Sequence, residues 1–257
     1  MNVFVILLAA SALTLPVLTP PAPAQDGGGD WDLREDPARK LTLATLEYEG
    51  APTLAVRCLD GDLSVMATRL PAPLPGANTM EMIVAERSPG LSWRPIGDGR
   101  TAYHAAPGIA ARDLRRGGSV TLRAIGDDGR LRRYDLSAPV ESANLGRVLQ
   151  ACGRALSDPR DDLRRLDPRD ITWTRRGRPE FPQAAAAKGI KTGEVVTSCV
   201  VNGMGGLDDC RIESETPKDA GFAAAASQSR EGARLALADG SSPDGALIIL
   251  TTRFQVE

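Results

Sequence analysis

Aromatic residues are scarce in this chain of 257 residues. Three Trp, three Tyr and four Phe make up 4% of the sequence, so Val, Leu, Ile and Ala have to form most of the core. The formal net charge is only -2, which leaves no overall basic field to attract nucleic acid or an anionic membrane. Hydrophobic residues at 42% and charged residues at 25% are ordinary values for a globular chain, and the length suits one large domain or two small ones.

Residues suited to catalysis or metal binding are also few. The single histidine, His104, has no recognisable catalytic motif around it, and the chain contains neither G-x-S-x-G nor a C-x-x-C pair. Asp60-Gly61-Asp62 and Asp208-Asp209 do not continue into a calcium-binding loop and fall where turns are expected. Small arginine clusters such as Arg175-Arg176 are typical of a solvated face. We therefore predict no catalytic residue, no cofactor and no metal site, and expect that the chain is not an enzyme.

The N-terminal residues predict export. An uncharged apolar run covers residues 3–18, and Ala22-Pro23-Ala24 has the small-x-small form of a signal-peptidase site. We expect a signal peptide over residues 1–24, a Gly-rich spacer over 25–30 and a periplasmic location. The run is shorter than the about 20 apolar residues of a spanning helix and contains Pro16. Because no Lys or Arg precedes it, an uncleaved anchor in the inner membrane, facing the periplasm, stays open as the alternative.

Four cysteines become informative once export is expected, because oxidising compartments favour disulfide bonds. They are Cys58, Cys152, Cys199 and Cys210, and four cysteines allow three different pairings. Four reduced, buried thiols are the alternative state.

A hairpin near the C-terminus would favour one pairing. Residues 195–201 and 210–215 are strand-like and flank a Gly-rich turn. If Cys199 lies opposite Cys210, Thr197 faces Ile212 and Val195 faces Ser214, and cross-strand neighbours are close enough for a disulfide. Cys58 and Cys152 would then form the second pair.

Residues 31–156 predict a β-rich domain of unknown function. Short apolar or alternating segments separated by turn residues are typical of strands, and they cover residues 41–48, 54–58, 63–67, 80–85, 120–125 and 131–136. One convincing helix is predicted over residues 143–156, where Leu145, Val148, Leu149 and Cys152 recur at helical spacing.

The remaining sequence divides into a linker and a C-terminal domain. Residues 157–170 are rich in Asp, Arg and Pro with charges of alternating sign, which favours a solvated linker. Residues 171–257 predict the order helix, strand, turn, strand, helix, strand, with helices over 183–187 and 220–237 and a final strand over 246–256.

The order of motifs in this last block is similar to that of the TonB C-terminal domain family. The matching segments are Phe181-Pro182, Gly193-Glu194-Val195, Val200-Val201-Asn202-Gly203, Gly206-Leu207-Asp208-Asp209, Ile212-Glu213-Ser214-Glu215 with Pro217, Gly221-Phe222-Ala223-Ala224-Ala225, and residues 250–254. The resemblance covers residues 179–257, under a third of the chain. The cysteines at 199 and 210 resemble a pair found in a subset of such domains.

This resemblance implies a three-stranded antiparallel sheet packed on helices, so the whole chain would belong to the α+β class. In the family, the domain binds outer-membrane receptors by adding a receptor strand to a sheet edge. By analogy, the partner-binding edge would be the final strand, with residues Leu247, Ile248, Ile249, Leu250, Thr251, Thr252, Arg253 and Phe254. An ordinary closing strand is the alternative. The implied partner is an envelope protein or peptide, such as an outer-membrane receptor, and not a nucleic acid.

The segment before this block departs from the family. A TonB transducer has an N-terminal membrane anchor and a long Pro-rich spacer, whereas a cleavable segment and a β-rich domain stand here. We therefore expect a periplasmic protein-binding module linked to TonB-dependent transport across the outer membrane. The alternatives are an anchored TonB-type energy transducer, which alone would contact the membrane, and a secreted enzyme or inhibitor acting through residues 31–156.

Overall fold

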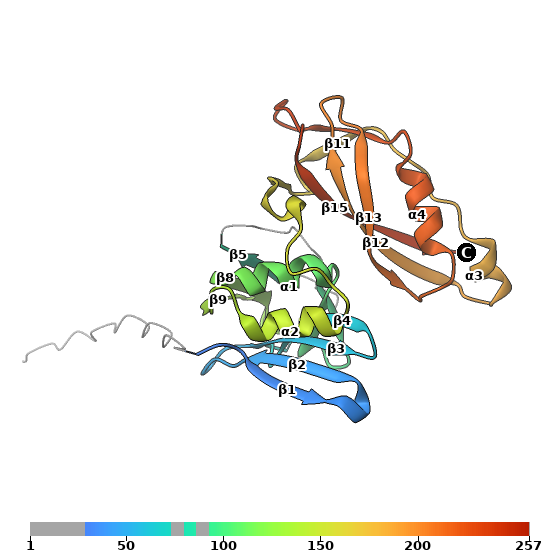
Figure 1. Ribbon diagram of the computed structural model, residues 1–257. Coiled ribbons are helices and arrows are strands. Elements are labelled where there is room, and N and C mark those ends of the chain that lie inside the picture. Colours follow the sequence, from blue (N-terminus) through green and yellow to red (C-terminus); the bar gives the residue numbers. More distant parts are fainter. Residues whose placement is uncertain (1–28, 73–79, 86–92, 257) are drawn as a thin grey trace, which may run out of the picture.

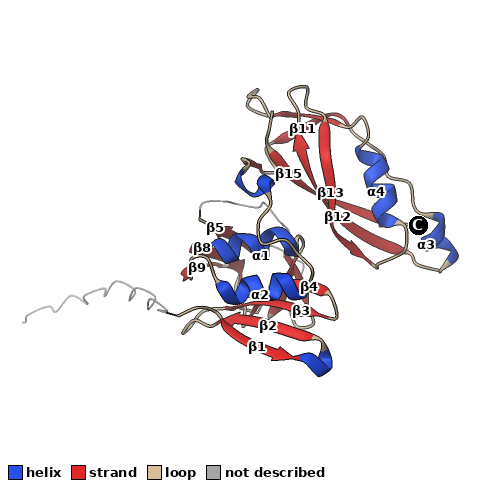
Figure 2. Cartoon of the chain, in the orientation of Figure 1, coloured by secondary structure: helices blue, strands red, loops and turns tan. Residues whose placement is uncertain are grey.

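The computed structural model describes residues 29–72, 80–85 and 93–256. The expected signal peptide and most of the expected spacer lie outside these residues. The described chain is α+β, with several mainly antiparallel sheets and few helices (Figure 1; Figure 2). Within the described ranges, no helix is long and apolar enough to cross a membrane.

Two sheets form the N-terminal part of the chain, residues 29–156. Six strands pair in the order β1-β2-β3-β4-β7-β6, and three more pair in the order β5-β8-β9, all antiparallel. The strands are β1 (Asp32–Asp36), β2 (Leu41–Leu46), β3 (Thr53–Leu59), β4 (Asp62–Thr68), β5 (Met80–Val84), β6 (Trp93–Ile96), β7 (Thr101–His104), β8 (Gly118–Ile125) and β9 (Leu131–Ala138). A one-turn 3-10 helix, η1 (Pro37–Arg39), joins β1 to β2.

Two helices, not one, pack on these sheets. Helix α2 (Ala143–Ala151) matches the predicted helix, and its N-cap Ser142 accepts a hydrogen bond from the Leu145 amide at 3.1 Å. It ends before the predicted residue 156. Helix α1 (Pro107–Arg116) was not predicted, because it is short and rich in arginine. It begins at Pro107 and buries Ile109 and Leu114.

The expected solvated linker over residues 157–170 is only partly right, because the segment is folded and several of its charges are paired. It contains a 3-10 turn, η2 (Pro159–Asp162), and a short strand, β10 (Arg165–Leu166). Arg160 and Asp161 are buried. Asp161 accepts hydrogen bonds from Arg112 of α1, with an Nε–Oδ2 distance of 2.8 Å. The charges in the first half of this segment therefore form ion pairs with neighbouring elements, while Arg164, Arg169 and Asp170 are exposed.

The C-terminal part, residues 171–256, is built on a sheet with the order β10-β15-β12-β13. Its long strands are antiparallel and are β12 (Thr192–Val201), β13 (Leu207–Thr216) and β15 (Leu247–Gln255). Strand β10 adds in parallel, so the sheet has four strands where three were expected. Helices α3 (Gln183–Ala187) and α4 (Phe222–Arg230) accompany this sheet (Figure 1).

The predicted helix over residues 220–237 is only half right. Helix α4 ends at Arg230, and Gly232 follows with a positive φ of 67°. Residues Arg234–Leu237 form a strand, β14, that pairs antiparallel with β11 (Ile171–Arg175). Helix propensity was overruled because Leu235 and Leu237 are buried in the core of this part.

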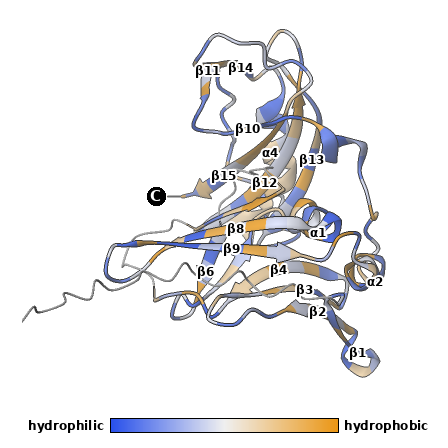
Figure 3. Ribbon diagram, turned by 90° about the vertical axis from the view of Figure 1, so that its left-hand side faces the viewer, coloured by the Kyte–Doolittle hydropathy of each residue, from blue (hydrophilic) through white to orange (hydrophobic). Residues whose placement is uncertain are grey.

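Helix α1 of the N-terminal part packs against the C-terminal sheet (Figure 3). Ile109 belongs to a buried cluster whose other members are Ala105, Ala106, Val196 of β12 and Ile249 of β15. Ser214 of β13 also donates a hydrogen bond to the Ala105 carbonyl at 2.8 Å. Because Phe222 of α4 packs with Phe254 in a separate cluster, the C-terminal sheet is covered on both faces.

Both expected cysteine pairs are bonded. Cys199 and Cys210 join β12 to β13 with a Cα–Cα distance of 4.1 Å, and Cys58 and Cys152 join β3 to the end of α2 with 5.5 Å. Each disulfide therefore fixes the packing within one part of the chain.

The register of the β12–β13 hairpin is partly as predicted. Thr197 lies opposite Ile212, as expected, but Val195 lies opposite Glu215 and not Ser214. Irregularities between Val196 and Thr197 and between Ser198 and Val200 shift the pairing.

Candidate functional site

The predicted binding strand corresponds to β15, and only part of its outer edge is open. Along one side, β15 pairs with β12 over its whole length. On its other side, β10 pairs with Leu247 and Ile248. These two residues therefore do not belong to an open edge, and the prediction is corrected for them. From Ile249 to Arg253, no strand of the described chain pairs with the outer side of β15.

Backbone hydrogen bonds at its two ends fix which backbone groups of β15 face outward. The Val256 amide donates to the Lys191 carbonyl at 3.1 Å, and the Leu247 amide donates to Arg164 on the opposite side at 2.8 Å. Because backbone groups alternate along an antiparallel strand and the β12–β15 register is regular, even-numbered residues face β12. The N–H and C=O groups of Thr251 and Arg253 consequently point outward from the edge of the sheet, on the side opposite β12.

The side chains of β15 alternate between two different surroundings. Leu250, Thr252 and Phe254 are buried on the α4 side, where Phe254 packs against Phe222 with ring centroids 5.0 Å apart. On the α1 side, Arg253 is exposed and Thr251 is half-buried. An added strand would therefore meet a different chemical environment on each face.

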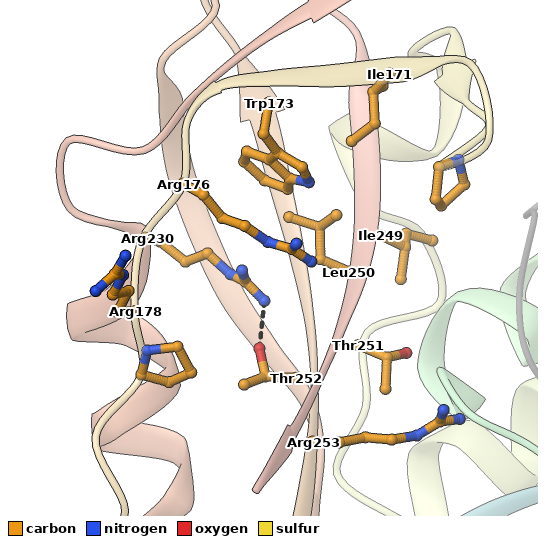
Figure 4. Close-up of a pocket in the computed structure, with 13 residues that line it drawn as sticks. Ile171, Trp173, Arg176, Arg178, Arg230, Ile249, Leu250, Thr251, Thr252 and Arg253 are labelled. Carbon is orange, nitrogen blue, oxygen red and sulfur yellow. Dashed lines mark hydrogen bonds between the residues drawn. The ribbon is translucent and has the colours of Figure 1, made fainter.

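A groove of about 710 Å³ runs along this open edge (Figure 4). Its walls come from β11, the segment after it, the end of α4 and β15. The lining residues are Pro168, Ile171, Trp173, Arg176, Gly177, Arg178, Pro179, Arg230 and residues 249–253. Four of these are arginine, and no acidic residue lines the groove among the described residues.

Arg230 lies deepest among these arginines. Its Nη2 donates to the Thr252 hydroxyl at 2.5 Å, while its Nε is buried without a hydrogen-bond partner in the described chain. Burial, together with the nearby charge of Arg176, lowers the pKa of Arg230 below its usual value. Figure 4 shows the Arg176 and Arg230 side chains both directed toward Leu250 and Thr252.

A glycine holds the arginine-bearing segment against α4. A Cβ built on Gly177 would lie 1.5 Å from the carbonyl oxygen of Ser229, so any side chain there would push the two segments apart. Arg176 and Arg178 are thus fixed near Arg230 by close backbone packing. Sequence reasoning treated Arg175-Arg176 as a solvated cluster and did not single out Arg230. The Arg-Gly-Arg sequence at 176–178 was a signal that could have identified Arg176 and Arg178 but not Arg230.

The far edge of the sheet, β13, is less suited to receive a strand. Arg160 from η2 donates a hydrogen bond to the Asp209 carbonyl at 3.1 Å, and Arg211 pairs with Asp158 at 2.5 Å. Charged side chains and register irregularities are common devices that discourage strand addition. The open segment of β15 is therefore the better candidate.

His104 is a buried structural residue. Its ring stands edge-on to Trp93 with centroids 5.0 Å apart, and its Nδ1 accepts a hydrogen bond from the Ala106 amide at 3.1 Å. Burial lowers its pKa to about 3. The imidazole is therefore neutral at ordinary pH. Within the described ranges, no group of three or more His, Cys, Asp or Glu side chains is placed to hold a metal ion.

Comparison with solved structures gives a structural similarity for part of this chain. No protein-family profile matches the chain, and no curated protein matches it. The solution NMR structure of the TonB C-terminal domain of Pseudomonas aeruginosa matches 37% of this chain and 96% of its own length. The sequence identity is 23% and the TM-score is 0.32.

Proposed function

We propose that the chain is a protein-binding module of the cell envelope that takes up an extended segment of its partner as a strand on β15. One observation carries the proposal: the backbone groups of Thr251 and Arg253 face a groove, and no strand of the described residues pairs with them there. Main-chain hydrogen bonds supply the affinity in this mode, and the groove walls supply selectivity. The ordered motifs shared with the TonB C-terminal domain family support the same mode of binding.

The N-terminal part has a mechanical role in this proposal. Helix α1 packs on Val196 and Ile249, and paired charges tie α1 to η2 and β10. These contacts hold β15 in place while its outer edge is used. The sheet would then accept a strand with little rearrangement, which reduces the entropy lost on binding.

The proposed location is the periplasm, after removal of residues 1–24. Mass spectrometry of the chain recovered from an envelope fraction tests this part, and a mature N-terminus at Gln25 is expected. An intact Met1 in the membrane fraction would favour the anchored transducer instead. A link to TonB-dependent transport across the outer membrane would follow if the partner proves to be an outer-membrane receptor.

Binding can be tested without knowing the partner. Random peptides displayed on phage are selected against the full chain, and the enriched peptides are measured by calorimetry. Thr251→Pro removes the outward N–H and should abolish binding, whereas Thr251→Ala keeps the N–H and should bind within about twofold of the wild type. Failure to enrich any peptide, or equal binding by both variants, would overturn the proposal.

A further inference from the structure

Three of the four arginines that line the groove lack an acidic partner among the described residues, unlike the buried arginines that join neighbouring elements elsewhere in the structure. Arg112, Arg160 and Arg165 are each paired with carboxylates. In the groove, Arg253 pairs with Glu194 at 3.2 Å, but Arg176, Arg178 and Arg230 form no ion pair with any residue that the structure describes. The open edge of β15 therefore lies beside positive charge that the described chain leaves uncompensated.

Arg230 carries part of this positive charge in a largely buried position. Its Nε is buried, its Nη2 donates a hydrogen bond to the neutral hydroxyl of Thr252, and Arg176 lies close enough to repel it. Holding two guanidinium groups together in a partly dehydrated site is unfavourable until an anion arrives. The close packing of Gly177 on Ser229 fixes the backbone next to Arg176, so this arginine starts from a position beside α4.

Strand geometry specifies where an anion would lie. An added strand runs about 4.8 Å from β15, and its side chains alternate between the two faces. The partner residue beside Thr252 would point to the same face as Thr252. Because Arg230 already donates to the Thr252 hydroxyl, that partner side chain would meet the guanidinium groups of Arg230 and Arg176 (Figure 4).

We infer that the strand added to β15 is acidic, with a carboxylate at the position beside Thr252 that Arg230 and Arg176 bind. This inference rests on the proposed function and adds the chemical class of the partner. Carboxylates match the fork of guanidinium donors, and hydrogen bonds between charged groups are stronger than neutral ones. The preferred partner segment is then an extended stretch that contains Asp or Glu at this position.

The test uses peptides selected against the full chain as described above. Enriched peptides should contain Asp or Glu at one common position. Exchange of that Glu for Gln in a selected peptide should weaken binding about tenfold, since a charge-assisted contact is replaced by a neutral one. The affinity for the Glu peptide, and not for its Gln counterpart, should fall steeply with added salt.

Variants of the chain assign the effect to the two arginines. In Arg230→Gln and in Arg176→Gln, the Glu and Gln peptides should bind within about twofold of each other. Arg130→Gln, at a side chain that is 80% exposed on the N-terminal part, removes the same charge and should retain the full preference. Arg176 is exposed, so its variant remains informative if Arg230→Gln does not fold.

Two outcomes separate this inference from the function on which it rests. If Thr251→Pro abolishes binding but the Glu and Gln peptides bind equally, strand addition holds and the acidic preference is wrong. If the preference for Glu survives in both arginine variants, the assignment to Arg230 and Arg176 is wrong.

Discussion

Arg165 of β10 and Asp113 of α1 form a buried ion pair that joins the two parts of the chain. Their Nη1–Oδ2 distance is 2.5 Å and their Nη2–Oδ1 distance is 2.8 Å, so the pair is bidentate. The two side chains are only 3% and 2% exposed. β10 is also the strand that covers the start of β15. This pair therefore helps to define where the open edge begins.

Removal of one partner of this pair should destabilise the chain strongly. Asp113→Ala leaves the Arg165 charge buried without its carboxylate, which is expected to cost about 3–5 kcal/mol in unfolding free energy. The double variant Asp113→Leu/Arg165→Met should lose much less, because it buries no charge. Urea unfolding at pH 7 measures both, and a loss below about 1 kcal/mol in Asp113→Ala would contradict the buried pairing.

His104 predicts a pH dependence of stability. Its pKa is lowered to about 3 by burial, whereas the unfolded chain has the ordinary value of about 6.5. Above pH 6.5 both states are neutral, and below it only the unfolded state takes up the proton. The free energy of unfolding should therefore fall by about 2 kcal/mol between pH 7 and pH 5. His104→Asn should be nearly flat over this range, and equal slopes in both proteins would refute the assignment.

Gly193 should tolerate no side chain while Phe222 keeps its place. A Cβ at residue 193 would lie 2.4 Å from the Phe222 ring. Gly193→Ala should therefore destabilise the chain by about 1–3 kcal/mol through overpacking. In that background, Phe222→Leu should cost less than in the wild type. Thermal unfolding of the four proteins measures this coupling, and simple additivity would argue against the close contact.

The two disulfides should differ in their contribution to stability. Cys58 and Cys152 are separated by 94 residues, and Cys199 and Cys210 by 11. Loop-closure entropy gives about 4.7 kcal/mol for a loop near 100 residues and about 3 kcal/mol for a short one. Replacing both cysteines by Ala should therefore cost more for the first pair than for the second. Denaturant unfolding of the two double variants compares them, and the reverse order would contradict the entropic account.

Sequence patterns predicted the strands with clear alternation and the helix with strong periodicity. The β12–β13 hairpin, with Cys199 and Cys210 joined, was identified because turn residues and strand propensity agree there. Helix α1 and β14 were missed, because Ile109 and Leu235 are placed by tertiary packing that local preference does not encode. The Arg230 and Arg176 site escaped sequence reasoning because its residues come from segments more than fifty positions apart.

The central claim is that a partner strand pairs with the outer edge of β15. Amide hydrogen exchange, followed by NMR on the full chain with and without a selected peptide, tests it most directly. The amides of Thr251 and Arg253 should exchange quickly in the free chain and become protected in the complex. The Thr252 amide, which faces β12, should be protected in both states. Protection elsewhere on the molecule, with Thr251 and Arg253 unchanged, would contradict the claim.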